Sequence, residues 1–201
     1  FIRGDIKVPR PADKGPTYSQ SKTVRKLIGP AAYSYYDRPD SYESGVDVRS
    51  EGWKYVNIPH DYIVDQDNDP TQNNAHGFFK YDNAWYRKHF KLEEEARGKR
   101  ILLMFAGIAG HSVIYLNGCL MKHNYSSYNS FFVDISANVY FDRENIIAVY
   151  VNTEEFEGWW YQGGGIYRNI SLLITDPVAI DVYGVYAPAK KGRRKEVACR
   201  F

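Results

Sequence analysis

The sequence predicts an all-β protein built as a sandwich or a barrel. Aromatic residues make up 16% of the 201 residues, including 18 Tyr and 4 Trp, and they accompany 16 Gly and 9 Pro. This composition favours strands and turns over helices. From residue 53 onward, strand-sized apolar stretches recur between turn residues, which is typical of a sandwich or barrel. They occupy residues 53–58, 85–92, 100–108, 112–121, 130–135, 145–152, 166–174 and 178–186.

Local signals define three of the elements more closely. Apolar and polar residues partly alternate over 85–92, which predicts a strand with one buried face. The pair Asn117-Gly118 separates two apolar runs and predicts a tight hairpin, because both residues tolerate positive φ. The only helical candidate, residues 92–99, is too short to be stable alone.

The chain divides into three parts. Residues 1–52 are rich in Pro, Ser, Gly and Tyr and predict an extended arm with the first strand or strands. Residues 53–188 hold the predicted β domain, and 189–201 begin a linker or a further domain. The cluster of five cations within 190–195 lacks interleaved aromatic residues, so we interpret it as a solvated loop rather than a nucleic-acid site.

Charge and composition exclude several classes of protein. A formal net charge of +2 produces no field that indicates nucleic-acid binding. No apolar run approaches the roughly 20 residues needed to cross a bilayer. The two cysteines, Cys119 and Cys199, are far apart without C-x-x-C spacing, which excludes a disulfide scaffold or a four-cysteine zinc site and leaves the compartment open.

No metal or cofactor site is predicted. Asp65, Asp67 and Asp69 resemble the start of a calcium loop, but Pro70 and His76 stand where that loop requires Gly and Glu, so an acidic solvated loop is preferred. Cys119 and His123 would lie about 13 Å apart along one strand and cannot share an ion. His60 and His111 have no second ligand at a suitable spacing, so each is interpreted as a turn or core histidine.

Two further catalytic or phosphate motifs fail. No nucleophile elbow and no paired Cys and His are present. A phosphate loop at Gly163–Gly165 would need a following helix and a Lys, whereas Ile166 begins a predicted strand. The glycines therefore serve another purpose, such as the close approach of a ligand or of another segment.

Residues 154–168 combine three acids, three consecutive aromatic residues, four glycines, three of them consecutive, and an arginine. Aromatic rings stack on the C–H face of a sugar, and neighbouring carboxylates or amides accept hydrogen bonds from its hydroxyls, so this segment predicts a pocket rim or a domain interface. The alternative is that the aromatic residues belong to the core and that Arg168 forms a buried ion pair. In an extended segment, Trp159 and Tyr161 would face one way and Trp160 the other.

Five motifs, taken together, resemble the N-terminal domain of glycoside hydrolase family 2. They are V-N-I-P-H-D-Y at 56–62, A-W-Y-R-K-H-F at 84–90, V-I-Y-L-N-G at 113–118, E-N-I-I-A-V-Y-V-N at 144–152 and G-W-W-Y-Q-G-G-G-I-Y-R-N-I at 158–170. The resemblance runs from about Trp53 to about Tyr186, and its last motif is closest to the β-galactosidase branch. PHDY stands where PHDW is common in the family.

The resemblance implies a galactose-binding-like jelly-roll β-sandwich, followed by an immunoglobulin-like domain and a (β/α)₈ barrel with two catalytic glutamates. Two loops of this domain would reach toward the barrel and the sugar. Carried over, the pocket rim comprises Glu157, Trp159, Trp160 and Tyr161, and the second loop, at about 73–83, includes Asn73, Asn74, Asp82 and Asn83.

No catalytic residue is predicted in this chain. Glu154, Glu155 and Glu157 lie together on one loop and cannot oppose each other across a glycosidic bond. The resemblance therefore implies an accessory domain that walls the pocket and braces the barrel, with carbohydrate and the chain's own downstream domains as partners. Whether the parent assembles into oligomers stays open. The alternatives are a free-standing carbohydrate-binding module and a purely structural interaction domain.

Overall fold

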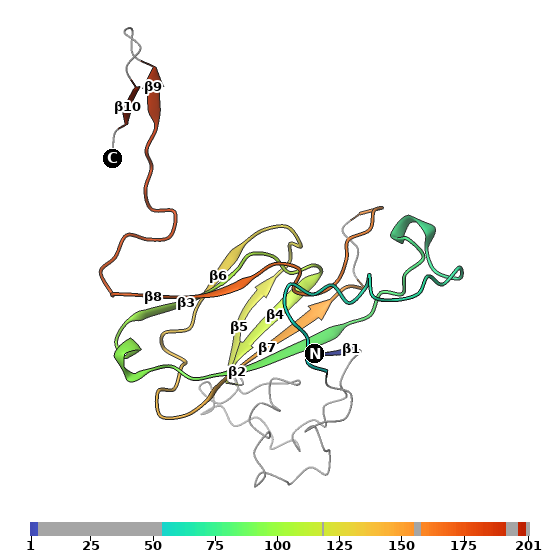
Figure 1. The fold of residues 1–201 in the computed structure, drawn as a ribbon, viewed down its shortest axis with the longest axis horizontal. Coiled ribbons are helices and arrows are strands. Elements are labelled where there is room, and N and C mark those ends of the chain that lie inside the picture. Colours follow the sequence, from blue (N-terminus) through green and yellow to red (C-terminus); the bar gives the residue numbers. More distant parts are fainter. Residues whose placement is uncertain (4–53, 118, 155–157, 192–196, 200–201) are drawn as a thin grey trace, which may run out of the picture.

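The computed structural model describes residues 1–3, 54–117, 119–154, 158–191 and 197–199. Two antiparallel sheets form a sandwich, as Figure 1 shows. One sheet contains, in order, β1 (Ile2–Arg3), β2 (Ala84–Phe90), β7 (Asn145–Asn152), β4 (His111–Leu116) and β5 (Cys119–Asn124). The other contains β6 (Phe131–Asp134), β3 (Arg100–Phe105) and β8 (Ile170–Thr175). The all-β jelly-roll sandwich that the sequence predicts is confirmed.

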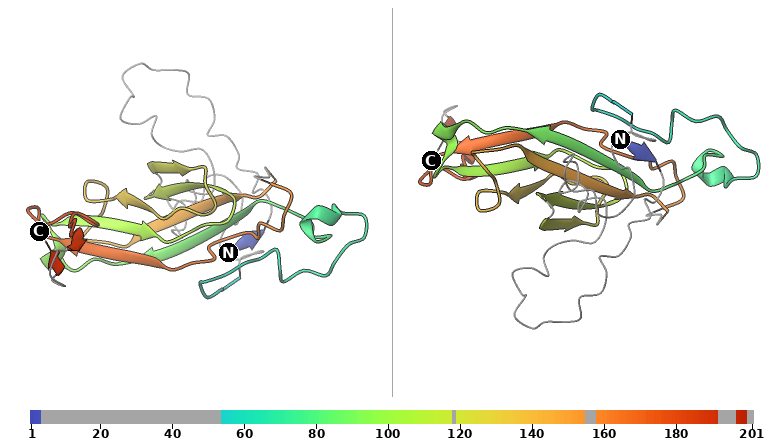
Figure 2. Two further views of the ribbon diagram at one scale, coloured as in Figure 1. Left: turned by 90° about the horizontal axis from the view of Figure 1, so that it is seen from above. Right: turned by 90° about the horizontal axis from the view of Figure 1, so that it is seen from below.

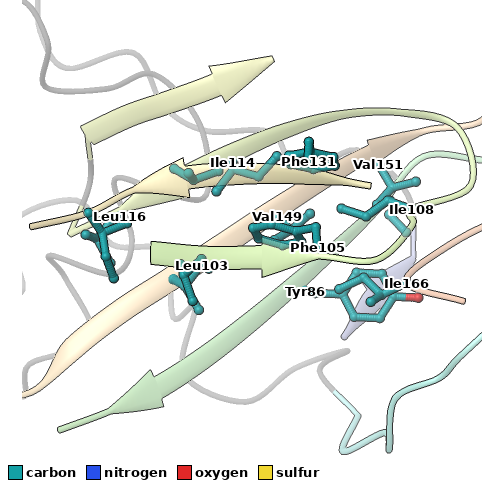
Figure 3. Close-up of a cluster of buried hydrophobic side chains, with 14 of the residues drawn as sticks. Tyr86, Leu103, Phe105, Ile108, Ile114, Leu116, Phe131, Val149, Val151 and Ile166 are labelled. Atoms are coloured by element: carbon teal, nitrogen blue, oxygen red, sulfur yellow. The ribbon is translucent and has the colours of Figure 1, made fainter. Parts of the chain in front are cut away.

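The core lies between the two sheets, where alternate side chains of facing strands meet (Figure 3). In β4, burial alternates strictly along the strand, and Ile114 and Leu116 are completely buried. From the three-stranded sheet, Phe105 stacks on Phe131 with ring centroids 4.9 Å apart. The period of two in β4 therefore separates a core face from an outer face, as the pleat of a strand requires.

The hairpin is where the sequence predicts it. Leu116 pairs with Cys119 across the turn, and Asn117 has a φ of 49°. The helical candidate forms only the 3₁₀ turn η3 (Glu94–Ala96). The prediction of one buried face for β2 is wrong at its start, because Trp85 is buried on the opposite side from Tyr86. There Trp85 packs against the rings of Tyr115 and Tyr150.

Two predicted strands do not form. Trp53 lies outside the described residues, and 54–58 contain no strand: among the described residues, Lys54 and Phe1 exchange two backbone bonds, and no ladder continues from them. Residues 178–186 contain no strand, and their apolar side chains are largely exposed. Pro177, which follows β8, lacks an N–H, so it cannot donate to the ladder and extend β8.

Beyond that segment, β9 (Ala189–Lys191) pairs with β10 (Val197–Cys199) in a hairpin that projects away from the sandwich in Figure 1. Lys190 and Lys191 therefore lie in a strand, which corrects the prediction of a loop there. Arg193, Arg194 and Lys195 lie outside the described residues. Within the described part of the chain, no helix has the length and hydropathy to cross a membrane.

The connections that matter for a site gather at one end of the sandwich. The segment 54–83, with the 3₁₀ turn η2 (Asn74–His76), and the connection from β7 to β8 lie together at this end in Figures 1 and 2. We call this region the loop end.

Candidate functional site

Three predicted rim residues are on the surface at the loop end. The side chain of Trp159 is 90% exposed, that of Trp160 is 52% exposed and that of Tyr161 is 39% exposed. The alternative of core aromatics is therefore wrong for these three residues. Arg168 is exposed and donates to the carbonyl of Ala106, so the buried ion pair that the same alternative requires does not form. Glu157, the fourth predicted rim residue, lies outside the described residues.

The three aromatic residues do not alternate as an extended strand would. Residues 158–160 form a bend. Trp160 and Tyr161 are both hydrogen-bonded, to Tyr128 and Asp61 respectively, whereas Trp159 is almost fully exposed. The expectation that Trp159 and Tyr161 are alike is therefore wrong, because strand geometry does not apply to a bend.

The glycine run accommodates another segment of the chain. The N–H of Tyr62 donates to the carbonyl of Gly164 (2.9 Å), and the N–H of His60 donates to that of Ile166 (2.8 Å). A Cβ on Gly165 would lie 2.7 Å from the backbone oxygen of His60, and the φ of this glycine is 116°. The glycines therefore permit the close approach of residues 60–63.

Asp61 connects the two segments through its carboxylate. Its Oδ1 accepts from the N–H of Ile63 and of Gly164, both at 2.9 Å, and its Oδ2 accepts from the hydroxyl of Tyr161 at 2.9 Å. Burial, and then the bond to Asp61, raise the pKa of Tyr161, so the phenol stays protonated and donates. Sequence reasoning missed Asp61, although the P-H-D-Y motif contains it.

The second predicted loop meets the first. His76 donates through Nε2 to the carbonyl of Gly158 (3.1 Å), and Phe79 packs edge-on against Tyr161 with ring centroids 5.6 Å apart. The N–H of Gln162 donates to the hydroxyl of Tyr81 (3.3 Å). The structure thus brings the two loops together, but the second loop contributes His76, Phe79 and Tyr81 rather than the four residues that the sequence analysis named.

The four predicted residues of the second loop lie elsewhere in it. Asn73 caps η2 by accepting from the N–H of Ala75 (2.9 Å), and Asn74 is exposed. Asp82 forms ion pairs with Arg3 (2.8 Å) and Lys80 (3.3 Å). Asn83 is buried. Asn73 and Asp82 thus shape the loop, and a role of these four residues in sugar binding stays a prediction.

The tyrosine of P-H-D-Y fixes the base of the second loop. Its hydroxyl, on Tyr62, donates to the carbonyl of Asp82 (2.7 Å), which also accepts from the hydroxyl of Thr153 (2.6 Å). Burial raises the pKa of Tyr62, so the phenol remains a donor. The hydroxyl of Tyr62 therefore ties the segment 60–63 to the end of the second loop.

The acidic run at 65–69 is not organised around an ion. Asp69 accepts from both the N–H (2.9 Å) and the hydroxyl (2.7 Å) of Thr71, and these bonds lower the pKa of its carboxyl. Among the described residues, no group of three or more His, Cys, Asp or Glu could hold a metal ion.

The fold and the loop end define a class: an all-β sandwich domain that presents aromatic side chains beside a glycine-rich loop, which hydrogen bonds hold in place. The family described as "Glycosyl hydrolases family 2, sugar binding domain" matches residues 24–177, and the chain belongs to this family. The match begins upstream of Trp53, so it includes part of the segment predicted as an arm, and it ends before Tyr186.

Known relatives carry two different activities in their names. The chain is 29% identical to β-galactosidase BoGH2A of Bacteroides ovatus over 72% of its own length and 17% of that protein. It is 31% identical to a β-glucuronidase of Formosa agariphila over 64% of its length and 15% of the relative. The chain thus spans less than a fifth of the length of either protein.

A solved structure agrees with the fold. A β-glycosidase from Bacteroides vulgatus superposes with a TM-score of 0.65 at 30% identity, over 69% of this chain and 18% of that one.

Proposed function

We propose that the chain is the N-terminal accessory domain of a family 2 glycoside hydrolase of the β-galactosidase type, which releases terminal β-linked sugars with retention of configuration. In this proposal the loop end forms one side of the sugar pocket and packs against the catalytic barrel, which it supports. The observation that carries it is the exposure of Trp159 and Trp160 on a loop that Asp61 and the second loop hold in place.

Aromatic side chains on a loop that hydrogen bonds keep in place are suited to the recognition of a sugar. A pyranose offers a flat C–H face to an indole and hydroxyls to nearby acceptors. Because the loop is fixed by hydrogen bonds from both sides, little conformational freedom is lost when a sugar binds. The domain therefore contributes binding and positioning.

The chemical step would belong to the downstream barrel. Retention requires two carboxyl groups about 5 Å apart, one as nucleophile and one as acid and base. At the loop end, Asp61 is occupied by N–H and O–H donors, and Asp82 is paired with Arg3 and Lys80. These carboxylates hold the fold, so they do not supply the pair.

We expect the 201-residue chain to leave nitrophenyl β-galactoside unhydrolysed, and the longer protein that contains it to release β-galactose first. Absorbance measures turnover, and proton NMR of the first product identifies the anomer. Turnover by the chain above buffer, or α-galactose as the first product of the longer protein, would contradict the proposal.

Substitution of Trp159 tests whether the loop end forms one side of the sugar pocket. In the longer protein, Trp159→Ala should lower kcat/KM for the nitrophenyl substrate by about 10-fold, the equivalent of one lost contact of about 1.4 kcal/mol. The melting temperature should barely move, because the side chain is 90% exposed in this domain. Tyr186→Ala removes another exposed aromatic ring and should change neither value. Unchanged kcat/KM for Trp159→Ala would remove this residue from the pocket.

A free-standing carbohydrate-binding module is the alternative, since exposed aromatic residues would also serve there. The proposal of an accessory domain is supported instead by the relatives, of whose length the chain covers only 17% and 15%. Reading the gene downstream of Phe201 distinguishes the two, because a module would lack an adjoining barrel.

A further inference from the structure

A second feature involves Trp160 of the predicted rim, which contacts the loop between β5 and β6. The indole Nε1 of Trp160 donates to the hydroxyl of Tyr128 at 2.7 Å. A Cβ on Gly158 would overlap the six-membered ring of Trp160, so the absence of a side chain there lets the indole lie against the backbone. These two contacts fix the ring, yet its side chain stays 52% exposed.

The partner of this indole is itself anchored. The preceding residue, Ser127, is completely buried, and its hydroxyl accepts from the N–H of Gly110 (3.0 Å). Its carbonyl accepts from the hydroxyl of Tyr167 (2.8 Å). Tyr128 is 48% exposed, and because its oxygen accepts the indole N–H, its own proton remains to be donated.

The segment that carries Tyr128 indicates the chemistry of a ligand. The segment 124–130, which comprises the last residue of β5 and the loop to β6, reads Asn-Tyr-Ser-Ser-Tyr-Asn-Ser, and its side chains supply only aromatic rings, amides and hydroxyls. The core of a protein interface would be more apolar, and a sugar carboxylate would need a cation. Aromatic rings among neutral hydrogen-bonding groups instead match an uncharged pyranose.

We propose that Trp160 and Tyr128 form a platform for a sugar unit of a neutral β-linked oligosaccharide, with the pyranose stacked on the indole and one of its oxygens accepting from Tyr128. This inference rests on the proposed function and extends it, because it assigns a substrate longer than one sugar. We call the pair the Trp160 platform.

Binding to the 201-residue chain tests the platform without the catalytic domains. Galactotetraose with β linkages is titrated while the indole N–H signals of the four Trp residues are followed by NMR. The signal that is missing in Trp160→Ala should shift and saturate. The tetrasaccharide should bind at least about 10-fold more tightly than galactose, which engages one open surface only and should bind at millimolar concentration or above.

Matched variants assign the contacts. Trp160→Ala should weaken tetrasaccharide binding by about 10-fold or more, and Tyr128→Phe, which keeps the ring but removes the hydroxyl, by roughly 3-fold to 10-fold. Tyr186→Ala should bind as the unchanged chain does. Melting temperatures within the error of the parent would show that each variant folds.

Three outcomes would overturn the platform: no saturable shift, equal binding of tetragalacturonate, or a concentration-dependent dimer that Trp160→Ala abolishes. The last would identify a second copy of this chain as the occupant. If the 201-residue chain does not bind the tetrasaccharide but the longer protein hydrolyses galactosides, only the platform is contradicted. If the chain binds the tetrasaccharide but the longer protein hydrolyses no galactoside, only the proposed function is contradicted.

Discussion

Gly165→Ala is expected to lower the free energy of unfolding by about 3 kcal/mol, because two unfavourable effects coincide. The φ of 116° at this position is one that residues with a side chain rarely adopt. The new Cβ would also lie 2.7 Å from the backbone oxygen of His60 and closer still to the hydroxyl of Tyr86. Urea denaturation of the 201-residue chain measures the change as a shift in midpoint at constant m.

Gly98→Ala separates the two effects. Gly98 has a φ of 79°, but nothing lies within 4 Å of the Cβ that the change would add. Only the strain of a positive φ remains in this variant, so the free energy of unfolding should fall by about 1 kcal/mol. Equal losses for the two variants would show that the approach of residues 60–63 to Gly165 is not tight, contrary to the geometry described above.

The contrast between these glycines illustrates what the sequence could predict. The hairpin at Asn117 follows from neighbouring residues alone, and it formed as expected. The use of the glycine run for a close approach could also be predicted. Which segment approaches could not, because His60 and Gly165 are brought together by the sandwich rather than by any local signal.

The same distinction explains the mistaken strands. The apolar composition of 178–186 satisfies the local criterion for a strand, but a strand also needs a partner ladder, and none forms along these residues. At β2, the buried outer face of Trp85 depends on rings contributed by β4 and β7, so alternation within β2 could not reveal it.

The candidate site shows the limit most clearly. Composition alone directed attention to Trp159, Trp160 and Tyr161, which are exposed at the loop end. The residues that hold them, Asp61 and Tyr128, could not be identified from the sequence. The bond from Tyr161 to Asp61 spans 100 residues, and that from Trp160 to Tyr128 spans 32. Candidate residues for contact with a ligand can be suggested by type, whereas the residues that hold them in place can be identified only from the fold.

Among the residues that hold the aromatic loop in place, Asp61 is the one whose loss should lower the free energy of unfolding most. Asp61→Ala deprives the N–H of Ile63, the N–H of Gly164 and the hydroxyl of Tyr161 of their acceptor. A donor left without a partner costs about 1 to 3 kcal/mol when it is buried and less when water can reach it. Since Tyr161 is 39% exposed, we expect a total loss of about 3 kcal/mol in the free energy of unfolding.

Two milder variants identify the source of that loss. Asp61→Asn keeps a carbonyl oxygen for the two backbone donors and places an amide near the hydroxyl of Tyr161, so it should lose only about 1 kcal/mol. Tyr161→Phe removes a single bond and should lose a similar amount. In Asp61→Ala, the further change Tyr161→Phe should add almost nothing, because its partner is already gone. Fully additive losses in this double-mutant cycle would mean that Asp61 and Tyr161 act independently and that the carboxylate does not hold the aromatic loop.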